Sequence, residues 1–252
     1  DLELPSGVSN TIKLTDVYGK NVQNIHGYTS SIYGEDNVLT AVGYAVGSFY
    51  GWQTDGVFAN DAEASTAGAL GYLKYPTGLK EENKKYYDFK AGDVRFVDQN
   101  GDGVIDVADK VVIGNPNPDI YGNIYTSLTW KDLRLDVNFK YTVGNDIYNY
   151  QRAMLESGSQ FINQTTAVNR CWRVEGQETD IPKPVYGDPM GNSRFSDRWI
   201  ENGSFFKLKN VTLSYRVPIQ NEYIQGLTFW AAANNLFTLT KYLGTDPELS
   251  RS

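Results

Sequence analysis

The sequence predicts an all-β fold, with antiparallel strands of a transmembrane β-barrel joined by long extracellular loops. Three observations lead to this fold class: one strand with an apolar and a charged face, an alternation of short and long connections, and the absence of long apolar runs. No run of 18 apolar residues occurs among the 252 residues, which excludes a transmembrane helix. A barrel strand needs no such run, because only every second residue faces lipid.

The stretch Leu133–Tyr141 reads L-R-L-D-V-N-F-K-Y and carries the clearest pattern. Side chains alternate between the two faces of a strand, so its odd-numbered positions form one apolar wall. In a membrane barrel this wall would contact lipid and the other wall a wet lumen, whereas in a soluble β-sandwich it would face a core. The polar wall, a candidate substrate surface of a lumen, consists of Arg134, Asp136, Asn138 and Lys140.

Four further stretches have strand character. With their flanks they reach about the 9–11 residues that a tilted strand needs to cross a bilayer. They are Val38–Tyr50, Ile124–Trp130, Phe205–Val217 and Leu227–Leu239. Two glycines, Gly43 and Gly47, interrupt the first of them.

The apolar residues of Phe205–Val217 change face part-way along the strand. Those up to Leu208 share one face, and those from Val211 onward occupy the other. A β-bulge near Lys209-Asn210 would return them to a common face. The alternative is that the lower part of the strand faces a loop or a plug inside the lumen.

The connections between the strands alternate in length. Lys131-Asp132 forms a two-residue hairpin turn, and Pro218–Gly226 is a second short connection. Residues 51–120 and 142–198 are long. Outer-membrane barrels have short periplasmic turns and long extracellular loops, so we expect both long segments outside the cell. A short helix is expected in the second, around Arg152–Glu156.

Composition excludes several functions. A net charge of −7 argues against nucleic-acid binding, which requires a basic surface. The single histidine, His26, and the single cysteine, Cys171, argue against a zinc site, a histidine-based triad and a disulfide framework. A glycosidase needs two carboxylates around one bond, and no spacing here indicates such a pair, so we expect no enzyme. The 18 tyrosines favour an interfacial aromatic girdle over a ligand platform.

Residues 98–109, D-Q-N-G-D-G-V-I-D-V-A-D, follow the spacing of an EF-hand-type calcium loop. Oxygen ligands fall at the required positions and a glycine at position 6. The last ligand is aspartate rather than bidentate glutamate, which predicts weaker binding. The alternative is an Asx-rich turn held by side-chain-to-backbone hydrogen bonds. The expected calcium ligands are Asp98, Asn100, Asp102, the Val104 carbonyl, Asp106 and Asp109.

Several stretches, in this order, resemble landmarks of SusC/RagA-type TonB-dependent outer-membrane transporters. They are V-G-S-F-Y-G-W-Q-T-D-G-V-F at 46–58, G-D-V-R-F at 92–96 with the acidic loop that follows, I-G-N-P-N-P at 113–118, G-N-D-I-Y-N at 144–149, F-K-L-K-N-V-T-L-S-Y at 206–215 and N-N-L-F-T-L-T-K-Y at 234–242.

The resemblance implies late strands of a large plugged barrel of about 22 strands. Residues 1–252 would be the C-terminal portion of the barrel, because the chain starts without Met and shows no plug. Such a protein resides in the outer membrane of a Gram-negative cell, in contact with outer-membrane lipid. It imports oligosaccharides or peptides together with a SusD-like surface lipoprotein, and is powered by the TonB complex through its N-terminal part.

A second interpretation comes from a different class of protein. The chain would be a soluble, secreted β-sandwich that binds carbohydrate, and a calcium loop would brace it. In that case the apolar walls of the strands would be buried against a second layer of the same molecule.

Overall fold

The computed structural model consists of two compact units. We call residues 117–148 with 201–252 the sheet unit and residues 1–116 with 149–200 the loop unit. The structure describes residues 14–15, 21–22, 24–29, 36–66, 70–72, 86–219, 223–224 and 226–248. Gln220–Glu222 and Gln225, in the predicted turn 218–226, lie outside the described residues, and so does the side chain of His26.

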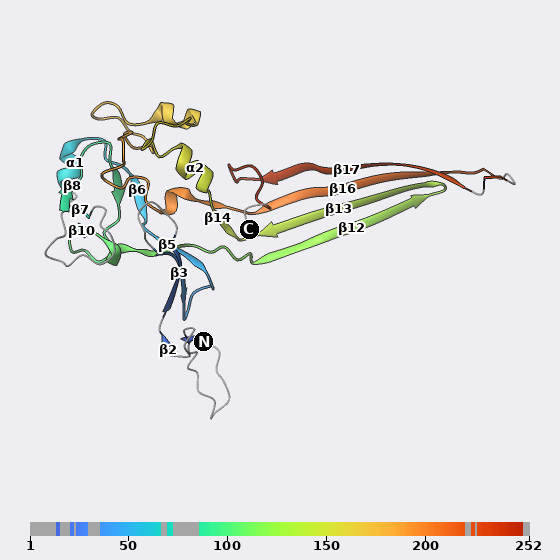
Figure 1. The fold of residues 1–252 in the computed structure, drawn as a ribbon, viewed down its shortest axis with the longest axis horizontal. Helices are drawn as coiled ribbons and strands as arrows, with labels where there is room; N and C mark the ends of the chain where they lie inside the picture. The colour runs from blue at the N-terminus through green and yellow to red at the C-terminus, as the bar shows by residue number, and fades with distance from the viewer. Residues whose placement is uncertain are drawn as a thin grey trace, which may run out of the picture. The chain divides into compact units, whose positions relative to one another are not determined.

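Four long strands form the sheet unit (Figure 1). Their order is β12-β13-β16-β17, and each pairs antiparallel with the next. Each is 11 to 14 residues long, enough to cross a bilayer. This confirms the predicted antiparallel barrel segment, which is here an open sheet. The bounds are Ile120–Trp130 for β12, Leu133–Val143 for β13, Phe205–Val217 for β16 and Leu227–Thr240 for β17.

The register of the four strands places their apolar side chains on one shared face. One transverse row, for example, consists of Ile124, Phe139, Leu208 and Phe237. This face is bare: Leu128, Trp130 and Phe229 are 61%, 71% and 61% exposed. A soluble sandwich would bury these residues, so the second interpretation is not supported. A lipid-facing sheet requires such a face.

A β-bulge in β16 keeps this face continuous. Asn138 pairs with Asn210 and Phe139 with Leu208, so Lys209 is the extra residue. The pairing with β17 shifts at the same place. The predicted bulge is confirmed, and Val211 returns to the apolar face, where it pairs with Val137.

The predicted hairpin turn is also confirmed. Trp130 pairs with Leu133, so Lys131 and Asp132 alone close the loop. Lys131 has a φ of 54°, in the left-handed region that tight turns require and that most residues avoid.

The expected strand Val38–Tyr50 is wrong. The chain turns between β4, Asp36–Ala41, and β5, Ser48–Gly51, and the two short strands pair with each other. Gly43 and Gly47 have φ values of 94° and 72°, so they permit a turn where the β-rich composition predicted continuity. With β3, Asn24–Thr29, and β11, Val111–Gly114, these strands form a sheet of order β11-β5-β4-β3.

The other elements are short. α2 lies in the region where a helix was expected, and its N-terminus is capped by the Asn149 side chain, which accepts from Arg152 N–H. No helix in the described part of the chain is long and apolar enough to span a membrane. The remaining bounds are β1 Leu14–Thr15, β2 Asn21–Val22, β6 Thr54–Val57, α1 Asp61–Thr66, β7 Leu70–Tyr72, β8 Tyr86–Asp88, β9 Val94–Phe96, β10 Val104–Ile105, η2 Val107–Asp109, β14 Asp146–Tyr148, α2 Tyr150–Leu155, η3 Thr166–Arg170, η4 Asp197–Trp199 and β15 Ile200–Asn202.

The two long segments that the sequence presents as separate loops pack together in the loop unit. Trp172 Nε1 donates to the Ala59 carbonyl at 3.0 Å, and Val94 N–H donates to Asn192 Oδ1 at 2.8 Å. They share a small core that includes Trp52, which is 1% exposed, and Phe58. The described residues of 51–116 and 149–198, which make up most of the two predicted loops, therefore belong to one compact unit.

Two cations complete the core of the loop unit. Lys110 Nζ lies 4.4 Å from the centroid of the Trp52 ring, and the Arg194 guanidinium lies 5.0 Å from it. Gly51 allows Phe195 to approach, because a Cβ at Gly51 would lie 2.5 Å from the Phe195 carbonyl oxygen. Two cation–π contacts to Trp52 and a close approach of Phe195 at Gly51 thus add to the small apolar core of this unit.

Val137→Arg tests whether the apolar face contacts lipid. A cation on a lipid face at mid-membrane costs about 2–4 kcal/mol, so we expect assembly of the full-length barrel to fail or fall sharply. Ser127→Arg is the matched control, because Ser127 pairs with Asp136 on the polar face. Heat-modifiable gel mobility of outer-membrane fractions measures assembly. Equal assembly of both variants would contradict lipid contact.

Candidate functional site

The polar face of the sheet unit brings the four predicted substrate residues together. Strand alternation places them opposite the apolar face, and the register adds polar side chains from the other three strands. The result is a broad hydrophilic wall. Its members include Tyr125, Ser127, Arg134, Asp136, Asn138, Lys140, Lys207, Lys209, Asn210, Thr212, Ser214 and Asn234.

One half of this wall is a neutral network. Arg134 donates from Nε and Nη2 to the Asp136 carboxylate, both at 2.9 Å. Tyr125 donates its hydroxyl to the same carboxylate at 2.7 Å. The Arg134 and Asp136 charges neutralise each other in this pair, and both side chains keep hydrogen-bonding atoms that can bind further groups.

The other half is a lysine cluster around one carboxylate. Nζ atoms of Lys140, Lys207 and Lys209 donate to Glu248 at 2.8, 3.0 and 2.8 Å. Lys207 also donates to Asp246 at 2.7 Å. Both acids belong to the segment that follows β17, which therefore folds back onto the polar face.

The register explains why these acids are required. Lys140 and Lys207 are direct cross-strand partners, and like charges in such positions repel. The Lys207 side chain is only 3% exposed, so water screens this repulsion poorly. Glu248 contacts both lysines and offsets the repulsion.

The lysines also shift the acids' titration. Hydrogen bonds from Lys140 and then Lys209 lower the pKa of Glu248 to about 2. Burial is the largest single influence on the pKa of Asp246 and raises it, but the hydrogen bonds from Lys207 and from Glu248 N–H, together with the charge of Lys207, outweigh burial, so the pKa is lowered. Both carboxylates are therefore ionised at neutral pH.

Sequence reasoning found Lys140 but missed its partners. Glu248 lies 108 residues further along the chain, and no local pattern reports that contact. The sequence indicates only that Lys207 and Lys209 alternate with Phe206 and Leu208, which places both lysines on the polar face of their strand.

Asn138 adds a buried acceptor to the wall. Its Oδ1 atom is buried and has no hydrogen-bond partner within the described part of the chain. The neighbouring amides are paired, since Asn210 Nδ2 donates to Asn234 Oδ1 at 2.8 Å. Asn138 thus carries an acceptor without a partner among the described residues, and neighbouring atoms cover it.

The predicted calcium loop lies in the loop unit and is closed by its own hydrogen bonds. Asp98 accepts from the N–H groups of Gly101 and Gly103 at 2.7 and 2.8 Å. Asp109 accepts from Gln99 and Asp106 N–H at 2.9 and 2.8 Å. The bond from Gly103 is the largest cause that lowers the pKa of Asp98, whereas burial raises the pKa of Asp109.

This arrangement matches the Asx-turn alternative. Within the described ranges, no group of three or more His, Cys, Asp or Glu side chains is placed to hold a metal ion. Each acidic side chain still has lone pairs beyond those that accept from the backbone. Calcium binding by Asp98, Asn100, Asp102, Val104, Asp106 and Asp109 stays a prediction.

Comparison with known proteins shows what the chain is similar to. No protein-family model matches the chain. Over 209 residues it is 30% identical to "TonB-dependent receptor P3" of Formosa agariphila, which covers 82% of this chain and 19% of the relative. It is 28% identical over 166 residues to "TonB-dependent receptor SusC" of Bacteroides thetaiotaomicron, with 61% and 15% covered. The predicted resemblance to SusC/RagA-type TonB-dependent receptors is confirmed.

A solved structure supports the same assignment. The structure of the RagAB peptide transporter matches with a TM-score of 0.59 at 27% identity, over 94% of this chain and 23% of that one. The chain thus spans less than a quarter of these SusC/RagA-type relatives. Their names describe receptors and a transporter rather than enzymes, in agreement with the expectation from composition.

One SusC-like landmark has a clear packing reason. In the landmark at residues 144–149, the Asn145 carbonyl accepts from Gly203 N–H at 2.8 Å. A Cβ at Gly203 would lie 2.4 Å from Asn145 Nδ2 and 2.6 Å from Ile147. The landmark therefore requires glycine at position 203, between β15 and β16.

The Glu248 cluster predicts a pH dependence. Because its pKa is depressed from 4.5 to about 2, its stabilisation is complete above pH 4.5 and is lost as the pH falls through 2. Glu248→Gln should remove this component and cost about 1–3 kcal/mol at neutral pH. Thermal unfolding in detergent across this pH range measures both effects. Glu178→Gln, an exposed site, is the control, and an identical loss in it would contradict the assignment.

Calcium binding can be tested at Asp98. If the loop binds calcium, terbium luminescence should titrate to one site, and Asp98→Ala should weaken it at least about tenfold, or ~1.4 kcal/mol. Glu175→Ala, outside the loop, should bind as the parent does. Unchanged terbium affinity in Asp98→Ala would rule out these ligands.

Proposed function

We propose that the chain is part of a TonB-dependent outer-membrane transporter that imports an oligosaccharide or peptide without chemical change. One observation carries this proposal: four strands of membrane-crossing length share a continuous apolar face, and the opposite face carries polar side chains with charges on its two central strands. A barrel wall between lipid and a wet lumen needs both faces.

The connections support an orientation. β12 and β13 are joined by two residues, whereas residues 144–204 separate β13 from β16. Short connections are periplasmic in such barrels and long ones extracellular. The strand ends at Val143, Phe205 and Thr240 would then lie on the extracellular side.

The partners follow from the relatives. The solved relative is named as a peptide transporter, RagAB, and a second is named SusC. By analogy we assign to the whole protein a SusD-like lipoprotein as its outer partner and a connection to the TonB complex through its N-terminal part. The substrate wall would be Arg134, Asp136, Asn138 and Lys140, where paired charges offer contacts to polar oligomers.

Uptake by cells tests the proposal. Cells with and without the full-length gene are supplied with a labelled peptide pool and a glycan panel, and depletion of each species is measured. We expect at least one species to depend on the gene. Asn138→Leu should reduce its uptake several-fold at unchanged barrel level, because the wall loses a polar side chain between Asp136 and Lys140. Gene-independent uptake of every species would refute import.

Glu63→Gln, in the loop unit and away from the polar face, is the control. It should leave uptake unchanged. An equal loss in both variants would show that the Asn138 effect is not local to the wall.

A further inference from the structure

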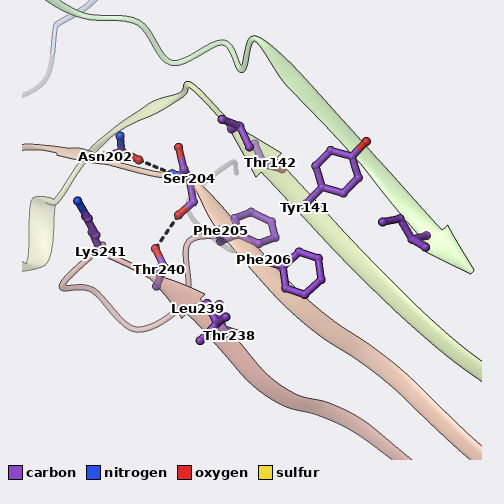
Figure 2. A pocket seen from close by; sticks show the side chains of 12 residues that line it. Tyr141, Thr142, Asn202, Ser204, Phe205, Phe206, Thr238, Leu239, Thr240 and Lys241 are labelled. Carbon is purple, nitrogen blue, oxygen red and sulfur yellow. Dashed lines mark hydrogen bonds between the residues drawn. The ribbon is translucent and has the colours of Figure 1, made fainter.

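A groove lies on the sheet unit at the strand ends opposite the Lys131 hairpin (Figure 2). Its volume of about 850 Å³ falls within the roughly 300–1,000 Å³ typical of ligand sites. The wall described above does not include it, and neither does the calcium loop.

The floor of the groove belongs to the apolar face. Tyr141, Phe206 and Leu239 are direct partners across three strands and line the groove side by side. The next residue in this row is Gly122, and a Cβ there would lie 2.9 Å from the Tyr141 hydroxyl oxygen. The absence of a side chain at Gly122 allows the tyrosine to lie flat along the sheet.

The rim of the groove is polar and fixed. Ser204 N–H donates to Asn202 Oδ1 at 2.8 Å, and Thr240 Oγ1 donates to the Ser204 carbonyl at 2.9 Å (Figure 2). Lys241, which is exposed, adds a positive charge at this rim. Among the described residues that line the groove, none is acidic.

We propose that this groove binds one phosphate-bearing lipid of the outer leaflet, with an acyl chain along Tyr141, Phe206 and Leu239 and its phosphate at Lys241. This inference rests on the proposed function, which places the apolar face in lipid and this strand end on the outer side. An apolar floor that ends in a cationic, hydrogen-bonding rim complements an anionic amphiphile. A general lipid coat would need neither the groove nor the charge.

The hairpin end of the same sheet provides an internal control. Lys131 Nζ lies 5.2 Å from the centroid of the Trp130 ring, so a lysine also stands next to an exposed aromatic residue there. The residues that line the groove all lie at the other end. Comparing charge reversal at Lys241 with charge reversal at Lys131 therefore distinguishes lipid binding in the groove from nonspecific attraction of anionic lipid to an exposed lysine.

The experiment uses the full-length protein in phosphatidylcholine nanodiscs that contain either bisphosphorylated or dephosphorylated lipid A. Native mass spectrometry after detergent release counts retained lipid. We expect one bisphosphorylated molecule per protein and about tenfold less of the dephosphorylated form. Lys241→Glu should lower retention about tenfold, and Lys131→Glu should not change it. Leu239→Trp should lower it by filling the groove without changing charge.

Two results would overturn the proposal: equal retention by Lys241→Glu and Lys131→Glu, or equal retention of the two lipids. Self-association of the protein that Leu239→Trp abolishes, without lipid retention, would overturn it in favour of a contact between copies. Heat-modifiable mobility and substrate uptake are measured on the same preparations. A protein that assembles and imports but retains no lipid refutes this site alone, whereas one that neither assembles nor imports refutes the transporter.

Discussion

The two-residue period of the long strands is the constraint on which the rest of the structure depends. Along each of the four strands, alternate side chains lie on the apolar face and on the polar face. The hydrogen-bonded register aligns this alternation from strand to strand, so that both faces continue across the sheet. Lys209 is the extra residue that corrects the alternation in β16. Without it, Val211 and the apolar residues that follow would lie on the charged face, and both faces would lose their continuity.

Sequence alone predicted what depends on this local period. The strands Leu133–Tyr141 and Phe205–Val217, the hairpin at Lys131 and the bulge at Lys209 follow from patterns within about a dozen residues. Val38–Tyr50 failed because composition favoured a strand, whereas two glycines with positive φ decided for a turn. The two-residue alternation thus identifies strands that have one polar and one apolar face. It predicts strands less well where each face carries both polar and apolar residues.

Long-range contacts could not be predicted in this way. The position of Glu248 among three lysines depends on a fold-back of the segment after β17, and the contacts of Asp93 and Asn192 in the loop unit join residues 99 apart. The calcium pattern illustrates the same limit: spacing predicts which oxygens could converge, but the Asp98 and Asp109 carboxylates bind backbone N–H groups. Candidate residues can be named from sequence, whereas their partners come from tertiary structure.

The cross-strand pair Lys140 and Lys207 has a consequence for how the sheet is built. These two ammonium groups oppose each other at one end of β13 and β16, and their counter-ion arrives only with a later part of the polypeptide. The pairing of β13 with β16 at this end therefore depends energetically on the acidic segment after β17, because without it two facing ammonium groups would repel each other uncompensated.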